Sequence, residues 1–350
     1  MNKAILVLGT SLISFSSSAA NIYDDGSTKA DIKGYLAASL YLSGDDTSAY
    51  PNESGLKDHY SRVRFAFQHQ ITDNWVGSAQ VEWGFDGQNQ DSTTNSLNLV
   101  NRLANYGFVN SEVGSIRIGK QWSVYGDIAR MTDQFWIWGA SASGFYDGRY
   151  GFDGGDSGQG RADDALTYRH KIGNIQIGAQ YQVEEKHRSN GAADRDYGYQ
   201  LALASDFDSG IKLGVTYATT KYSDDVDTVA MLFGAKYTSQ YWYIATTIGQ
   251  YENEHVFDGV AASSNKQTGS LGSELYVRYN TTSNTALYGG YNYLEDKDSI
   301  GELSYGLLGA EWTPGKLVLA AEYKLAETEK DANGSDIGED AFGLHLRYFF

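Results

Sequence analysis

The chain lacks cysteine altogether and has only 2 prolines among its 350 residues. Without cysteine it can form neither a disulfide scaffold nor a thiolate metal site. Positive charge is also scarce, because 27 Lys and Arg stand against 44 Asp and Glu and give a formal net charge of −17. A nucleic-acid-binding protein needs a basic surface, so this balance argues against a nucleic-acid partner.

Long hydrophobic runs are missing as well. After residue 20 no apolar stretch approaches the roughly 20 residues that a membrane-spanning helix needs. The stretch from Ala4 to Phe15 follows the basic Lys3 and precedes the small residues Ser18 and Ala20. This arrangement is typical of a secretory signal peptide. We therefore expect residues 1–20 to be removed on export and residues 21–350 to form one domain in a Gram-negative envelope.

Glycine and tyrosine, by contrast, are abundant, with 40 and 27 residues. Together with the scarcity of proline they favour strands and tight turns over helices. The dominant pattern is an alternation of two faces with period 2, as in Ile175 to Val183 and Lys316 to Leu325. We count about sixteen such runs. They start near residues 30, 58, 75, 97, 116, 162, 175, 197, 211, 227, 241, 269, 285, 303, 316 and 340.

The connections between these runs alternate strictly between long and short. The long ones are 43–57, 86–96, 123–161, 184–196, 219–226, 252–268, 295–302 and 327–339, and the short ones lie near 72–74, 112–114, 172–174, 208–210, 238–240, 281–284 and 313–315. A barrel produces this alternation when its rims face different compartments, with short periplasmic turns and long outer loops. The predicted fold is therefore all-β, a transmembrane up-and-down antiparallel β-barrel of roughly 16 strands.

A soluble β-sandwich or jelly roll is the alternative, because its strands would alternate in the same way. Such folds show no regular alternation of loop lengths, and the polar faces here carry the Gln, Tyr and charged residues that suit a wet lumen. Aromatic residues near the strand ends also fit the girdles of a membrane barrel. Examples are Trp75, Trp83, Trp242 and Trp312.

Several segments, in order, resemble the general diffusion porins of Gram-negative outer membranes. Lys29–Gly34 is similar to the first strand of that family, and Tyr60–Val63 is similar to the second. Asn101–Ala104 resembles the fourth strand, and Gly154–Asp156 resembles the Gly-Gly-Asp near the tip of the third loop. The strand after that loop is matched by Ala165–Arg169. No single motif is specific, but their order and spacing cover most of the mature chain.

The resemblance implies an outer-membrane homotrimer of barrels, each with its third loop folded into the lumen. Such a barrel is a water-filled channel for the passive diffusion of ions and small hydrophilic solutes. The resemblance also implies contact with outer-membrane lipid and lipopolysaccharide, and recognition of the terminal Phe350 by the barrel-assembly machinery. The segment from Ser123 to Gly160 is the longest connection and is expected to be the inserted loop.

A pore selects solutes by its width and by the fixed charges at its narrowest point. Strand alternation places Arg62 and Arg64 on the inner face, and Arg102 and Arg161 are also expected to face inward. In the family a row of wall arginines faces carboxylates on the third loop, and Arg62, Arg102 and Arg161 occupy matching positions. These residues form the predicted basic side of a constriction.

The predicted acidic side consists of Asp147, Asp153 and Asp156 in the long loop. The family motif Pro-Glu-Phe-Gly-Gly-Asp is altered here, because the proline is absent and the carboxylate is shifted by one position. From the acidic outer loops we expect a moderate cation preference that weakens as salt rises.

Aromatic residues in the long loop leave two interpretations open. They could pack the loop against the barrel wall, or they could form a stacking platform for a sugar in a substrate-selective, for example oligosaccharide, channel. The residues are Phe135, Trp136, Trp138, Phe145 and Tyr146.

A barrel hydrolase is the enzyme alternative, and it would need a nucleophile with a histidine at the outer rim. The six histidines are scattered along the sequence, and no nucleophile elbow or paired metal motif accompanies them. The acidic stretch 147–156 lacks the full pattern of a calcium-binding loop. The sequence therefore predicts no enzyme, no cofactor and no metal site.

Overall fold

The computed structural model describes residues 20–43, 54–85, 99–146, 148, 155–186, 193–254, 269–297, 301–330 and 334–350. The predicted signal peptide, apart from Ala20, lies outside the described residues, as do Asp147 and Asp153. Cleavage after residue 20 therefore stays a prediction.

Sixteen long strands among the described residues pair antiparallel, each with the next. They are β2 (Thr28–Ser43), β4 (Arg62–Gln70), β5 (Trp75–Gly84), β6 (Val100–Asn110), β7 (Gly114–Trp122), β8 (Arg161–Ile172), β9 (Ile175–Gln182), β10 (Arg195–Asp206), β11 (Ile211–Tyr222), β12 (Thr228–Thr238), β13 (Trp242–Glu252), β14 (Ser270–Asn280), β15 (Thr285–Asp296), β16 (Glu302–Trp312), β17 (Leu317–Lys330) and β18 (Ala341–Phe349). Two short strands, β1 (Ala20–Asp24) and β3 (Gly55–Asp58), also pair with β2.

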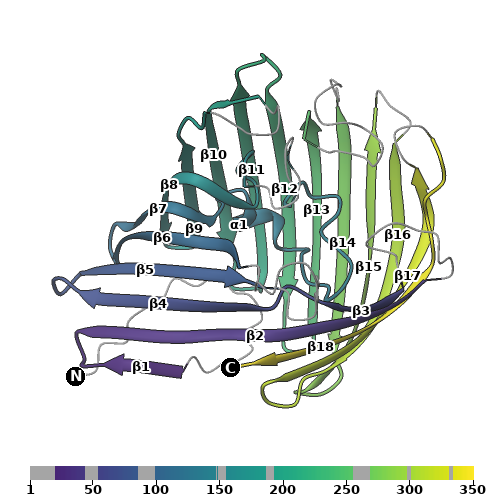
Figure 1. Ribbon diagram of the computed structural model, residues 1–350, viewed down its shortest axis with the longest axis horizontal. Helices are drawn as coiled ribbons and strands as arrows, with labels where there is room; N and C mark the ends of the chain where they lie inside the picture. The colour runs from purple at the N-terminus through teal and green to yellow at the C-terminus, as the bar shows by residue number, and fades with distance from the viewer. Residues whose placement is uncertain are drawn as a thin grey trace, which may run out of the picture.

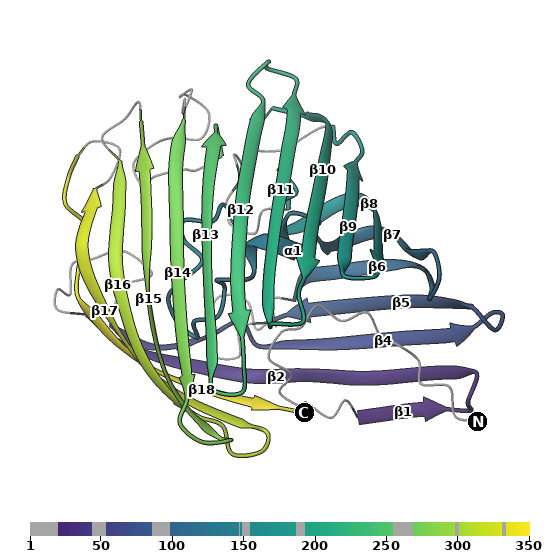
Figure 2. The same ribbon diagram turned by 180° about the vertical axis from the view of Figure 1, so that it is seen from behind.

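The sheet closes on itself because β18 pairs with β2, from Ala341 opposite Ser43 to Phe349 opposite Tyr35. Figures 1 and 2 show the result, in which β2, β4 and β5 cross the direction of β12 to β16 on the other side. Strands of a closed barrel must tilt against its axis, so opposite walls cross in this way. The predicted sixteen-stranded antiparallel barrel is confirmed. In the part of the chain that the structure describes, no helix is long and apolar enough to cross a membrane.

The outer face of the sheet is apolar and its inner face is polar, as the sequence predicted. On β10 the side chains of Leu201 and Leu203 are 57% and 50% exposed on the outside, whereas Gln200 is 1% exposed. An apolar outer face with polar side chains turned inward excludes the soluble sandwich, whose apolar residues would meet in a core.

The segment after β7 turns into the barrel. Among the described residues of this segment there is one short helix, α1 (Gly126–Ala129), and it contacts β10, β11 and β12. Ile128 lies so close to Gly214 and Gly234 that a Cβ at either glycine would stand 2.3 and 2.7 Å from its side-chain carbons. Glycine at these strand positions therefore makes the docking of α1 possible.

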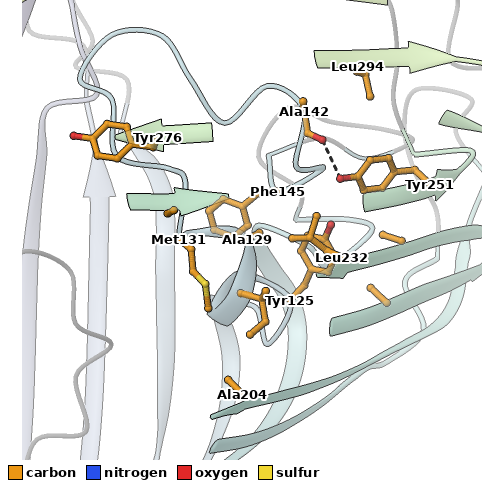
Figure 3. Close-up of a cluster of buried hydrophobic side chains, with 14 of the residues drawn as sticks. Tyr125, Ala129, Met131, Ala142, Phe145, Ala204, Leu232, Tyr251, Tyr276 and Leu294 are labelled. Carbon is orange, nitrogen blue, oxygen red and sulfur yellow. Dashed lines mark hydrogen bonds between the residues drawn. The ribbon is translucent and has the colours of Figure 1, made fainter. Parts of the chain in front are cut away.

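Inside the barrel the inserted segment forms the main buried apolar cluster. Figure 3 shows Tyr125 and Phe145 of the loop together with Leu232 and Tyr251 of the wall. The Tyr251 hydroxyl donates a hydrogen bond of 2.9 Å to the Ala142 carbonyl of the loop. The loop thus contacts inward-facing wall residues, as the predicted insertion of the third loop requires.

Candidate pore constriction

Three of the four predicted basic residues meet at one carboxylate. Arg64 Nη2 lies 2.5 Å from Glu82 Oε2, Arg102 Nε lies 2.9 Å from Glu82 Oε1, and Arg62 Nη1 lies 3.6 Å from the same oxygen. Glu82 is 1% exposed. We call Arg62, Arg64 and Arg102 the arginine wall.

Two features of strand pairing bring the three arginines to Glu82: the register of β4 against β5, and a bulge between β5 and β6. Arg64 on β4 lies directly opposite Glu82 on β5. Between β5 and β6 the pairing shifts, so that Glu82 faces Leu103 and Trp83 faces Asn101. The unpaired residue between them is Arg102, and such a bulge re-aims a side chain. Glu82 belongs to the inward phase of β5, but nothing in its local sequence distinguishes it from other polar lumen residues.

Arg161 lies apart from the Glu82 cluster, at the start of β8. Its guanidinium carbon is 5.6 Å from the ring centroid of Trp122 and 6.0 Å from that of Tyr146. Arg130 of the loop lies over the same Trp122 ring at 5.1 Å. Arg161 therefore contacts the base of the inserted loop, whereas the arginine wall contacts Glu82.

Asp133 is an acidic loop residue that the sequence analysis missed. Its Oδ2 accepts a 2.8 Å hydrogen bond from the Tyr146 hydroxyl. Burial raises the pKa of the Asp133 carboxyl, while the Tyr146 hydroxyl and the guanidinium groups of Arg130, Arg62 and Arg161 favour its charged form. Asp133 is thus a loop carboxylate that interacts electrostatically with Arg62 and Arg161 of the wall and with Arg130 of the loop. Its only sequence signal was its place in the longest connection.

Asp156 occupies a different environment from the one predicted. Its Oδ1 lies 3.3 Å from Arg195 Nη1 on β10, and its Oδ2 accepts a 2.7 Å hydrogen bond from the Tyr222 hydroxyl on β11. Arg195 is fully buried. The structure thus brings Asp156 to Arg195, not to the arginine wall, and the contact holds the returning end of the loop to β10 and β11.

Two buried glutamates on the opposite wall hold the loop backbone. Glu322 on β17 accepts N–H donors from Trp136 at 2.6 Å and from Ile137 and Trp138 at 3.1 Å each. Glu274 on β14 accepts the N–H groups of Ala142 and Ser143, both at 2.9 Å. We call Glu274 and Glu322 the anchor glutamates.

The loop aromatics pack against the barrel. Phe135 meets Tyr276 edge-on at 4.8 Å, and Phe145 stacks on Trp122 at 5.7 Å. Trp136 stacks on His345 at 5.5 Å, and its indole N–H donates to Glu311 at 2.7 Å. These rings are occupied by wall contacts, which favours the packing interpretation over a sugar platform.

The C-terminal residue lies at the closing strands. The Phe350 N–H donates to the Gly34 carbonyl at 3.1 Å, and the Gly34 N–H donates back at 3.3 Å. A Cβ at Gly34 would stand 2.7 Å from the Phe350 ring, so glycine makes room for that ring. Over the described ranges, no group of three or more His, Cys, Asp or Glu residues could hold a metal ion.

The chain is similar to known proteins of one family. A family model described as Gram-negative porin matches residues 7–350. Outer membrane porin N of Escherichia coli is 27% identical over 273 residues, which cover 71% of this chain and 68% of the relative. Outer membrane porin F of Salmonella typhimurium is 24% identical over 276 residues, covering 74% and 72%.

Solved structures show the same fold. The complex of Salmonella typhi OmpF with daunomycin has a TM-score of 0.79 at 19% identity, covering 94% of this chain and all of that one. The anion-selective porin from Comamonas acidovorans has a TM-score of 0.72 at 14% identity, covering 92% and 100%.

Proposed function

Because this chain belongs to the Gram-negative porin family and is an outer-membrane porin, we propose that its channel has a salt-dependent ion preference. Porins form water-filled channels for ions and small hydrophilic solutes. In this one the outer mouth favours cations at low salt, and the constriction opposes that preference. The predicted constriction is formed by the arginine wall and Arg161 on one side and by loop carboxylates on the other.

The observation that carries this proposal is the convergence of three arginines on one glutamate. Glu82 balances one of the three charges, so the wall keeps an excess of positive charge. Asp133 reduces that excess from the loop side, and Asp147 and Asp153 remain predicted contributors. The outer loops, in contrast, are rich in acids such as Glu184, Asp225 and Asp340.

The salt concentration distinguishes the effect of the acidic outer loops from that of the charges at the constriction. Loop charges more than about 8–10 Å from the ion path are screened at physiological salt, whereas charges at a narrow point are screened less. The cation preference should therefore be moderate in dilute KCl and should decline as salt rises.

Reversal potentials of single channels in KCl gradients, from about 0.03 M to about 1 M, test the proposal. Asp133→Asn should move the reversal potential toward anions at every salt concentration, as should the pair Asp147→Asn and Asp153→Asn. A cation preference that does not change with salt would show that the mouth acids do not produce it. No shift in the Asp147 and Asp153 pair would remove those two residues from the constriction.

The assembly state and assembly partners are also proposed from the family. We expect a homotrimer, lipopolysaccharide at its outer rim, and recognition of Phe350 by the barrel-assembly machinery. The paired hydrogen bonds between Phe350 and Gly34 support a role for Phe350 in closing the barrel. A purified complex with the mass of a monomer would contradict the trimer, and normal outer-membrane levels without Phe350 would contradict the assembly role.

A substrate-selective channel and a barrel hydrolase are the remaining candidates. The wall contacts of the loop aromatics weigh against a sugar platform, and membership of a family of channels favours transport over hydrolysis. Solute flux into proteoliposomes separates a general from a selective channel, because a general porin passes sugars in order of size.

A further inference from the structure

Arg347 lies on the inner face of β18, the strand that closes the barrel. Its neighbours Leu346 and Tyr348 are 45% and 47% exposed on the outer face, so strand alternation turns Arg347 into the lumen. It lies directly opposite Ala37 of β2 and Val318 of β17. Because β2 lies between β18 and β4, Arg347 is close to the strand that carries two residues of the arginine wall.

Two aromatic rings contact the Arg347 guanidinium. Its central carbon lies 4.1 Å from the ring centroid of Tyr35 and 4.8 Å from that of Trp136. The Arg62 guanidinium lies against the same Tyr35 ring at 4.6 Å. A guanidinium at these distances from a ring is attracted to its face. Tyr35 therefore joins Arg347 to the arginine wall, and Trp136 joins it to the long loop.

The inner face of β18 packs against the long loop. A Cβ at Gly343 would stand 2.4 Å from the Ile137 side chain, and His345 stacks on Trp136 at 5.5 Å. Arg347 is the next inward residue of β18 after His345, toward the end of the strand. Its charge therefore lies where the loop meets the wall.

The aromatic contacts leave the charge of Arg347 in place, because a guanidinium stays protonated and a ring carries no net charge. Its Nε makes no hydrogen bond within the described part of the chain, and the side chain is partly exposed. Arg102 of the wall repels this charge, whereas Asp133 of the loop attracts it. The same loop carboxylate therefore interacts with Arg347 and with the arginine wall.

We propose that Arg347 is a further selectivity-determining residue of the channel, which adds a fourth positive charge to the three of the arginine wall and places it against the loop. Charges at a narrow point of a pore act on passing ions with less screening than charges at its mouth. The flat guanidinium can stack on both rings, whereas an ammonium group remains a hydrated point charge. The proposal rests on the proposed constriction and adds to it a residue of the closing strand.

The test uses the purified full-length channel in planar bilayers, with a gradient of KCl around 1 M. Arg347→Gln removes the charge and keeps a long polar side chain. We expect the cation-to-anion permeability ratio, measured from reversal potentials, to rise about two-fold, as for a unit charge about 8 Å from the ion path in water. Arg347→Lys keeps the charge and should keep the ratio. A ratio that stays the same in Arg347→Gln, or rises equally in Arg347→Lys, would overturn the proposal.

Lys316→Gln is the matched control. Lys316 is exposed in the turn before β17, and its carbonyl accepts the N–H of Phe349, two residues from Arg347. The substitution removes the same charge from the rim, where charges are screened within about 3 Å at 1 M salt. The ratio should therefore stay at its wild-type value. An equal rise in Lys316→Gln and Arg347→Gln would show that the position of Arg347 has no special effect, which would also overturn the proposal.

A cysteine variant separates an effect of charge from an effect on structure. The chain contains no cysteine, so Arg347→Cys carries a single thiol. After assembly, a methanethiosulfonate reagent with a trimethylammonium group restores a positive charge, and one with a sulfonate group installs a negative charge. We expect the first reagent to lower the permeability ratio and the second to raise it.

Mass spectrometry verifies that the thiol has reacted. A thiol that reacts with neither reagent would show that residue 347 does not face the water of the lumen, and shifts of the ratio in one direction only would show that charge is not the cause. Either result would overturn the proposal. If Arg347→Gln does not assemble, the comparison of the two reagents decides.

These outcomes distinguish the role of Arg347 from the proposed function. A wild-type protein that conducts no KCl would contradict the channel itself, and a cation preference that is independent of salt would contradict the effect of the outer loops. A channel with the proposed salt dependence, but with the wild-type ratio in Arg347→Gln, would contradict the role of Arg347 alone.

Discussion

The two sides of the lumen around the long loop differ in charge, because one carries arginines and the other carries glutamates that bind the loop. The side built from β4, β5 and β6 presents the arginine wall, which is neutralised in part by Glu82 on the same side. The side built from β14 to β17 presents the anchor glutamates, whose oxygens bind backbone N–H groups of the loop. We therefore expect one wall to set the electric field of the pore and the other to set the position of the loop.

This division has a physical reason. A carboxylate that accepts several N–H groups fixes a backbone, because each hydrogen bond to a charged acceptor is worth about 1.5–3 kcal/mol. The arginines of the wall bind Glu82 and not the loop backbone, but their charge acts on ions that pass. The same lumen can therefore hold a loop on one side and attract anions on the other.

The largest effect is expected from breaking the anchoring side. Glu322→Gln loses its charge and one of the two acceptor oxygens that bind Trp136, Ile137 and Trp138. We expect a loss of about 3 kcal/mol in the stability of the loop–wall contact and noisier single-channel currents. Thermal unfolding followed by circular dichroism and current recordings measure the two effects.

Glu327→Gln is the control for that change, because Glu327 is exposed on the outer face of the same strand and accepts from the Tyr291 hydroxyl. An equal loss of stability in both variants would show that the anchor role is wrong.

A smaller effect is expected from a larger side chain on the wall that carries the anchor glutamates, with no change of charge. A Cβ at Gly272 would stand 2.0 Å from the Ala142 carbonyl oxygen, so Gly272→Ala must displace the loop. Overpacking of this kind costs about 1–3 kcal/mol. The unfolding temperature should fall, and the conductance should change with it. Gly306→Ala, where the nearest atom is 3.9 Å away, should leave both unchanged.

The arginine wall should respond in selectivity more than in stability. Arg102→Ala removes one positive charge from the pore. A unit charge at about 8 Å in water contributes about 0.5 kcal/mol, so the cation-to-anion permeability ratio should rise about two-fold. Reversal potentials in a KCl gradient measure this ratio. An unchanged ratio would show that Arg102 does not act on passing ions.

The smallest effect concerns pH at the loop. Burial raises the pKa of Asp133, so its carboxyl becomes neutral at a higher pH than an ordinary aspartate. Lowering the pH should therefore remove a negative charge facing the arginines and move the reversal potential toward anions. In Asp133→Asn, lowering the pH should not produce this shift of the reversal potential. Identical pH profiles for the two proteins would exclude Asp133 as its source.

The sequence predicted the barrel because its signals are local and repeated. Alternation in runs such as Ile175 to Val183 and the regular loop lengths need no knowledge of distant contacts. The inward phase of Arg62 and Arg64 followed from the same alternation. The position of Arg102 agreed as well, although the bulge that produces it was not predicted.

The acidic side of the site was harder, because it depends on how a long loop crosses the lumen. Asp133 and Asp156 both lie in the longest connection, yet Asp133 interacts with Arg62 and Arg161, whereas Asp156 binds Arg195. The difference arises from the anchor glutamates and from Gly214 and Gly234, which lie 86 to 186 positions from the loop residues that they contact. No period or motif within the loop carries that information.

The closing pair of strands has a consequence for how the molecule forms. The side chains of Ser39 and His345 are joined across the pair β2 and β18 by a 2.9 Å hydrogen bond, although 306 positions separate them in the chain. Contacts over such separations are slow to form, because the chain must lose the entropy of a very long loop before it gains them. Until they form, β2 and β18 each present an unpaired edge, which is a site for wrong pairing with another chain. The time between the emergence of β2 and the arrival of β18 is therefore the interval in which this protein most needs to be kept from aggregating.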